Sequence, residues 1–139
     1  MNRTNTANIA GRISYSVKAE LKYYVRREYP VFEISDNGRY IAYAVCRIED
    51  DVVWLESIYV RKEYRGKGIG KMLLEKAEEI AKEHGNDTLY QYVHPNNDRM
   101  LNFLKKNGYD VLNLIEIRKA YPQEEPKEEY TIGDHCYRY

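Results

Sequence analysis

The feature that most constrains this chain is a change of hydrophobic period in the middle of its 139 residues. From residue 31 to residue 60 the apolar side chains follow the alternation of half-buried strands. From residue 68 to residue 84 they recur every three or four residues, as on one face of a helix. The sequence therefore predicts an antiparallel meander followed by an amphipathic helix, a combination typical of the α+β class.

The same patterns, read along the whole chain, predict an ordered series of elements. Asn37-Gly38 is the strongest hairpin signal, Asp50-Asp51 marks a second turn, and Gly85 is placed to end a helix. Residues 122–129 form a polar connection, and residues 130–139 are either a terminal strand or a loose tail. The expected elements are strands at 13–17, 31–35, 40–48, 52–60, 88–93 and 110–119, and helices at 18–29, 68–84 and between Asn97 and Gly108.

Composition excludes several classes of protein. Lys and Arg together number 22, as do Asp and Glu, which disfavours a nucleic-acid binder held by bulk positive charge. No apolar run approaches the roughly 20 residues of a membrane helix, and no signal peptide is apparent. The two cysteines and three histidines lack metal-ligand spacing, so no metal site is expected. We expect one cytoplasmic domain over residues 1–139, with a core at about 31–119 and a tail at 122–139.

The loop between the predicted strand at 52–60 and the following helix carries the densest functional signal. It reads Arg65-Gly66-Lys67-Gly68-Ile69-Gly70-Lys71. Closely spaced glycines let a backbone approach a ligand, and the amides at the start of a helix favour an anion. With three basic side chains added, the loop can cradle a phosphate or pyrophosphate. The alternative is a tight turn whose basic residues are simply solvated.

Spacing distinguishes three kinds of phosphate-binding loop. A P-loop needs glycine where Arg65 stands and Ser or Thr where Met72 stands. A Rossmann loop needs G-x-G-x-x-G, whereas the spacing here is G-x-G-x-G. Arg65-x-x-Gly68-x-Gly70, after Ile58-Tyr59-Val60, instead resembles the acetyl-CoA loop of the GNAT superfamily of N-acetyltransferases.

This resemblance covers roughly residues 31–119 and is most specific over 58–74. It implies a mixed, mostly antiparallel sheet flanked by helices, with acetyl-CoA bound at the strand-to-helix turn after Val60. Asn97, which precedes a helix and Gly108-Tyr109, is similar to a second cofactor segment of the family. The resemblance also implies that one N–H of the strand, with Ile58 the leading candidate, stabilises the oxyanion. The implied cofactor-binding residues are Ile58, Tyr59, Val60, Arg65, Gly66, Lys67, Gly68, Ile69, Gly70, Lys71 and Asn97.

Acyl transfer to an ammonium requires a base, and Glu56 is the candidate. Strand alternation would place its side chain on the same face as that of Ile58. The segment from Trp54 to Val60 is similar to the strand of diamine and aminoglycoside acetyltransferases in which a glutamate faces the acceptor amine. The alternative is an ordinary strand glutamate that faces solvent or pairs with a neighbouring Lys or Arg.

The general acid is where the sequence departs from the family's pattern. The usual tyrosine, seven residues after Asn97, is replaced by Leu104, which cannot donate a proton. The general acid could instead be one of three other tyrosines, Tyr59, Tyr92 or Tyr109. Otherwise the CoA thiolate leaves as the anion.

We therefore expect an enzyme that passes an acetyl group from acetyl-CoA directly to a primary amine, on a small molecule or a protein. The rival is an acyl-CoA-binding sensor or structural subunit without turnover, which Leu104 favours and Glu56 opposes. A third interpretation, a nucleotide-binding module, predicts binding of ATP rather than CoA. The family's habit also suggests a homodimer.

Overall fold

The computed structural model describes residues 14–16, 29–85 and 87–139. The chain divides into two compact units, one ending at Tyr92 and the other spanning Val93–Tyr139. The helix predicted at 18–29 lies outside the described residues except for Tyr29, which is in no helix. The described strands and helices make up an α+β fold, the class that the sequence predicts.

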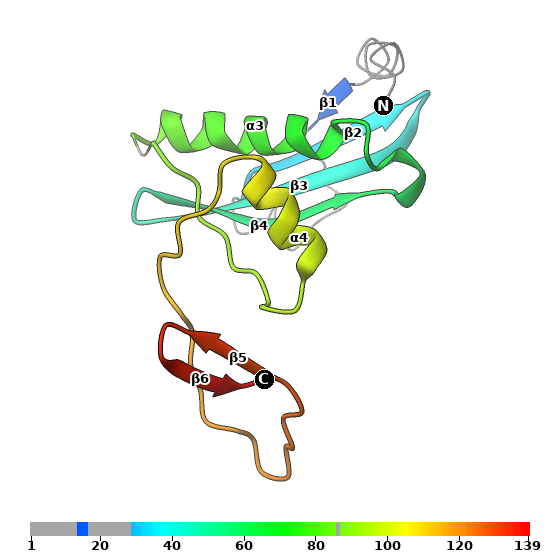
Figure 1. The fold of residues 1–139 in the computed structure, drawn as a ribbon. Helices are drawn as coiled ribbons and strands as arrows, with labels where there is room; N and C mark the ends of the chain where they lie inside the picture. Colours follow the sequence, from blue (N-terminus) through cyan, green and yellow to red (C-terminus); the bar gives the residue numbers. More distant parts are fainter. Residues whose placement is uncertain (1–13, 17–28, 86) are drawn as a thin grey trace. The chain divides into compact units, whose positions relative to one another are not determined.

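The first unit is built on a four-stranded antiparallel sheet, in the order β1-β2-β3-β4. Figure 1 shows the three long strands side by side. The predicted meander is therefore confirmed, and the short first strand with it. The strands are β1 (Ser14–Ser16), β2 (Val31–Asp36), β3 (Arg39–Glu49) and β4 (Val52–Val60).

Both predicted hairpin turns are present between these strands. Asn37 and Gly38 have φ of 51° and 78°, and Asp50 and Asp51 have φ of 50° and 63°. Two successive positive φ values give a turn whose twist matches that of the strands it joins. Asn, Asp and Gly are the residues that tolerate this conformation, which explains why the turns fall at these positions.

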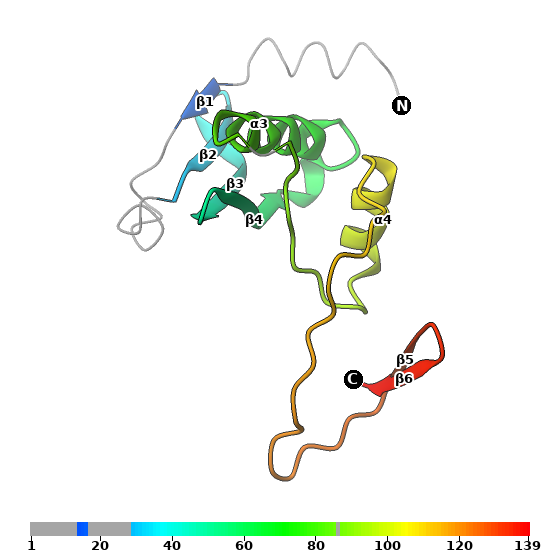
Figure 2. The same ribbon diagram turned by 90° about the vertical axis from the view of Figure 1, so that its left-hand side faces the viewer.

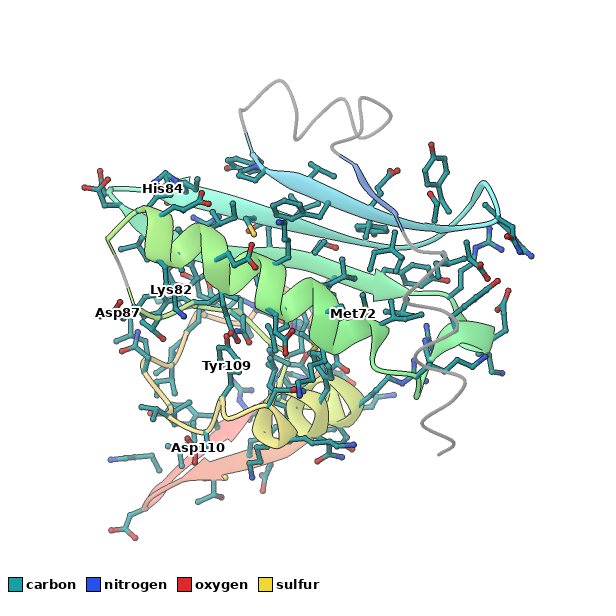
Figure 3. All side chains as sticks on the ribbon, turned by 90° about the horizontal axis from the view of Figure 1, so that it is seen from above. Met72, Lys82, His84, Asp87, Tyr109 and Asp110 are labelled. Carbon is teal, nitrogen blue, oxygen red and sulfur yellow. The ribbon has the colours of Figure 1, made fainter. Side chains whose placement is uncertain are left out.

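Helix α3 (Ile69–Glu83) covers one face of the sheet and follows a single 3-10 turn, η1 (Lys62–Tyr64). Figure 2, which views α3 nearly along its axis, shows the helix stacked on the strands. Figure 3 places Met72 near the start of α3 and His84 just past its end. The helix ends as predicted at Gly85, whose φ is 74° and whose N–H donates to the Lys82 carbonyl at 3.0 Å. Its fully buried side chains are Ile69, Leu73, Leu74, Ala77 and Ala81.

The second unit contains one helix and one hairpin. Helix α4 (Asp98–Lys106) begins after Asn97 and is followed by Gly108, as the sequence predicts. Strands β5 (Glu129–Ile132) and β6 (His135–Arg138) pair with each other in antiparallel register. The final residues are thus a two-stranded hairpin rather than one strand or a loose tail.

Two predicted strands are not formed. At 88–93 only Tyr90 pairs, through one parallel bridge to Trp54. Residues 110–119 have no regular secondary structure, although their composition favours a strand, and Val111 is 87% exposed. A strand requires a partner edge for its backbone groups, and local sequence carries no information about that partner. None of the described helices combines the length and apolar character that a membrane crossing needs.

Candidate active site

Strand β4 carries a bulge at Glu56. Opposite it on β3, Leu55 is aligned with Cys46 and Ser57 with Val45, so Glu56 has no cross-strand partner. A bulge inserts one extra residue into a strand and resets the alternation beyond it.

The bulge changes which backbone groups of β4 face outward, away from β3. Before it, the N–H of Leu55 points outward and donates to the Tyr90 carbonyl at 2.8 Å. After it, the N–H of Arg61 points inward and donates to the Ile41 carbonyl at 2.8 Å. Because direction alternates along a strand, the N–H of Ile58, three residues before Arg61, points outward.

A second contact supports this assignment of directions. The Nε of Arg65 donates to the carbonyl oxygen of Val60 at 2.8 Å, so the Val60 carbonyl lies on the outer edge. Ile58 and Val60 have the same parity and therefore share that edge. Within the described part of the chain, no strand pairs with the edge beyond Leu55, which leaves the Ile58 N–H available to a ligand.

The expectation that Glu56 and Ile58 share a face is wrong, and the bulge is the reason. Ile58 lies opposite Ala44, which alternation places on the same face of β3 as Cys46. Glu56 instead contacts Arg47, on the opposite face. The side chains of Glu56 and Ile58 therefore leave the same short stretch of β4 on opposite faces of the sheet.

Glu56 is part of an ion-pair cluster centred on Arg47. The Nε of Arg47 donates to Glu56 Oε2 at 2.9 Å, and its Nη1 lies 2.7 Å from Glu49 Oε2. Burial lowers the pKa of Arg47, but hydrogen bonds to Glu56 and Glu49 and their negative charges outweigh it, so the pKa is raised overall. The pairing with a neighbouring Arg that the sequence left open is thus present, and the role of Glu56 as a base stays a prediction.

Aromatic rings line the same part of β4. The Arg47 guanidinium lies 5.0 Å from the centroid of the Trp54 ring. Trp54 stacks on Tyr92 with ring centroids 4.6 Å apart and an interplanar angle of 10°, and it contacts Tyr90 at 5.2 Å. Tyr92 is 67% exposed, so one side of this stack faces solvent. Sequence reasoning singled out Tyr92 but missed Arg47, whose position opposite Trp54 depends on strand register.

The glycine loop leaves a run of backbone amides open. Gly66 and Gly68 have φ of 74° and 83°, and no side chain caps the start of α3. The first amide of the helix with a backbone acceptor is that of Met72, which donates to Gly68 at 3.1 Å. Among the described residues no carbonyl accepts a hydrogen bond from the amides of residues 66–71. This arrangement fits the pyrophosphate of acetyl-CoA.

The basic side chains of the loop are anchored to their own neighbours. The Arg65 guanidinium lies 5.7 Å from the Tyr59 ring centroid, besides its bond to Val60. Lys67 lies 5.5 Å from the ring centroid of Tyr64, and Lys71 is 3.9 Å from Glu75 on the exposed side of α3. Ile69 is buried in the core. Anion binding by this loop therefore depends first on its main chain.

The candidates in the second unit have structural partners there. Asn97 caps α4, since its Oδ1 accepts from the Met100 N–H at 3.2 Å. Leu104 is buried, and its carbonyl accepts from the Tyr109 N–H at 2.9 Å. The roles expected of Asn97 toward the cofactor and of Tyr109 as an acid stay predictions.

The described residues form no cluster that could hold a metal ion, and the buried cysteine is a poor nucleophile. No group of three or more His, Cys, Asp or Glu side chains is placed there to hold a metal ion. Burial raises the pKa of the Cys46 thiol to about 12, which keeps it protonated at neutral pH.

Comparison with known proteins decides the family. The model of the acetyltransferase (GNAT) family matches residues 5–109. The chain belongs to the GNAT family. It is 31% identical over 106 residues to the [ribosomal protein bS18]-alanine N-acetyltransferase of Haemophilus influenzae, covering 76% of this chain and 70% of that one. It is 32% identical over 87 residues to the thialysine N-epsilon-acetyltransferase of Bos taurus, covering 63% of this chain and 42% of the relative.

Solved structures agree with this GNAT assignment. The PaiA N-acetyltransferase from Thermoplasma acidophilum, in complex with coenzyme A, superposes with a TM-score of 0.63 at 28% identity, over 69% of this chain and 64% of that one. The aminoglycoside N-acetyltransferase AAC(6')-Iy, in complex with CoA, shares the fold with a TM-score of 0.63 at 20% identity, over 78% and 99% of the two chains. The expected acetyl-CoA-dependent N-acetyltransferase, which acts on an amine, is thereby confirmed.

Proposed function

We propose that the GNAT chain binds acetyl-CoA through main-chain groups at the end of β4 and the start of α3. The open amides of residues 66–71 would hold the pyrophosphate, and the outer edge of Ile58 to Val60 would pair with the pantetheine arm. The observation that carries this proposal is the outward N–H of Ile58, which the bulge at Glu56 turns away from β3. An N–H fixed in this way can donate to the thioester oxygen as it gains charge.

We assign proton removal from the acceptor ammonium to Glu56. This side chain is exposed enough to reach solvent, with 35% of its surface accessible, and it lies two residues before Ile58. Since Arg47 holds one of its oxygens, Glu56 would act through the other oxygen or through a water molecule. Leu104 cannot protonate the departing thiolate, so Tyr59 or Tyr92 would do so, or the thiolate would leave as the anion.

We propose a small cationic primary amine as the acceptor. Carboxylates at Glu49 and Glu56 and the stacked rings of Trp54 and Tyr92 suit an ammonium group through ionic and cation–π attraction. The relatives support an amine without fixing its size, because one is named for the alanine of a ribosomal protein and another for thialysine. A protein amine is therefore the second candidate.

Proline substitution at Ile58 tests the main-chain proposal. Ile58→Pro removes the N–H from an outward position, where proline breaks no bond to β3. We expect kcat to fall about 100- to 1,000-fold, the usual effect of losing an oxyanion donor. Val60→Pro is the matched control on the same edge, and it should raise the KM for acetyl-CoA with a smaller effect on kcat. Equal kcat values for Ile58→Pro and the unaltered protein would exclude Ile58 as the donor.

Turnover separates the enzyme from the proposed rivals. Thiol release from acetyl-CoA with a panel of polyamines, amino acids and peptides is expected for an enzyme, and Glu56→Gln should reduce it. Tight CoA binding without release across the panel would favour a sensor, and thermal stabilisation by ATP but not by CoA would favour a nucleotide-binding module. A cytoplasmic location, a homodimer and a single domain over residues 1–139 stay predictions.

A further inference from the structure

The Arg47 side chain is held in place by more contacts than is usual for an arginine at the surface. Its guanidinium bonds Glu56 on one side and Glu49 on the other, and it lies over the Trp54 ring. Its side chain is only 15% exposed, against 35% for Glu56 and 60% for Glu49. Three contacts from two strands therefore hold the cation, while the carboxylates remain partly open to solvent.

Glu56, by contrast, has little else to hold it. It is the extra residue of the bulge, so its position lacks the cross-strand partner that orients other side chains of the sheet. Among the described residues its carboxylate is held by Arg47, and a glutamate side chain has several rotatable bonds. The direction of this carboxylate therefore depends on Arg47.

We propose that Arg47 is a positioning residue that aims Glu56 at the acceptor amine. This inference rests on the proposed function of Glu56. Arg47 donates through Nε to Oε2 of Glu56, whose side chain stays partly exposed, while Glu49 and Trp54 keep the guanidinium in place. Only a planar guanidinium can bridge two carboxylates and lie over a ring at once, so lysine would replace it incompletely.

The competing explanation is an ordinary strand ion pair. Partly exposed pairs of this kind contribute little to stability, and their loss has no consequence for turnover. The two explanations predict different kcat values for variants of Arg47. A misplaced base slows the chemical step but leaves the binding of acetyl-CoA intact.

Steady-state kinetics of Arg47→Ala, Arg47→Lys and Arg39→Ala test the inference, with spermidine and other amines as acceptors. Arg47→Ala should lower kcat about 10- to 100-fold, while the affinity for CoA in calorimetry stays unchanged. Arg47→Lys should recover part of the loss. Arg39→Ala is the matched control, because Arg39 is also on β3 and pairs with a glutamate, Glu63, at 3.7 Å. It should leave kcat unchanged.

Chemical rescue and a double variant give a readout that a purely structural role would not change. Millimolar guanidinium ion should restore part of the kcat of Arg47→Ala but not that of Glu56→Gln. In the Glu56→Gln background, Arg47→Ala should cause no further loss of kcat, because the two residues act as a unit.

The outcomes distinguish the inference from the proposal beneath it. If Glu56→Gln lowers kcat but Arg47→Ala stays within about twofold of the unaltered protein, Arg47 is not a positioning residue and Glu56 remains the base. An equal loss from Arg47→Ala in both backgrounds would overturn the inference in the same way. If Glu56→Gln leaves kcat unchanged, Glu56 is not the base, and the positioning role of Arg47 is excluded as well.

Discussion

The two helices of this protein begin in opposite ways. α3 starts at Gly68, with φ of 83°, no side-chain cap and no acidic residue in its first turn. α4 starts at Asn97, whose side chain bonds the Met100 N–H, and has Asp98 in its first turn. The start of α4 is thus satisfied by its own sequence, whereas the start of α3 leaves its amides and its positive dipole to a ligand.

This difference predicts that an anion binds at the helix start whose amides the chain leaves without an acceptor. Glycine at Gly68 gives the turn its conformation but offers no oxygen to the amides that follow. Asn97 offers that oxygen, so its carboxamide is engaged within α4. Variants that alter one helix start at a time therefore test the assignment of the anion site to α3.

Among the variants at the two helix starts, the largest expected effect comes from Gly66, in the loop before α3. Gly66→Val should weaken CoA binding at least tenfold, because it strains a φ of 74° and displaces amides that would bond the pyrophosphate. Gly85→Val is a matched control, since Gly85 has the same φ and an added Cβ meets nothing within 4 Å at either glycine.

Both valine variants should lose about 1–3 kcal/mol of unfolding free energy in urea, the cost of a non-glycine residue in this conformation. Calorimetry with CoA then separates them. Equal loss of CoA affinity in the two would mean that the effect is one of stability rather than of the loop.

The next effect concerns Asn97 at the start of α4. Asn97→Ala should cost about 1 kcal/mol of unfolding free energy, as the loss of a cap usually does. Asn97→Asp keeps a capping oxygen but removes the amide donor, so it should preserve stability. If Asn97→Asp nevertheless weakens CoA binding, Asn97 contacts the cofactor as its resemblance to the family segment implies.

The smallest effect is expected for Asp98, in the first turn of α4. Asp98→Asn should reduce the unfolding free energy by about 0.3–1 kcal/mol at low salt and by less at high salt, because it removes a charge that favours the helix dipole. The affinity for CoA should not change. Urea titrations at two ionic strengths measure the difference.

Features carried by a few adjacent residues were predictable from the sequence. Asn37-Gly38 identified a hairpin, and Gly68 and Gly85 lie at the two ends of α3 where the sequence placed them. In each case the backbone conformation depends on what one residue tolerates, so the local sequence is enough to predict it. The glycine loop, which identified the family, is of this kind.

Features that depend on a partner strand could not be predicted in the same way. The bulge at Glu56 and the contact of Arg47 with it follow from how β3 pairs with β4, and alternation alone placed Glu56 on the wrong face. Residues 110–119 have the composition of a strand but form none. Composition reflects the intrinsic β-propensity of the residues and does not show whether a neighbouring strand is available to pair with them.

The extra residue in β4 also has a practical consequence for protein engineering. A saturation library meant to change acceptor choice would ordinarily vary every second position of a strand. The bulge at Glu56 shifts the alternation of side chains by one residue. Beyond the bulge, such a library would therefore vary side chains that face the hydrophobic interior instead of the intended surface. Codons for Trp54, Glu56, Ser57 and Tyr59 should be varied together, with Leu55 and Ile58 held constant.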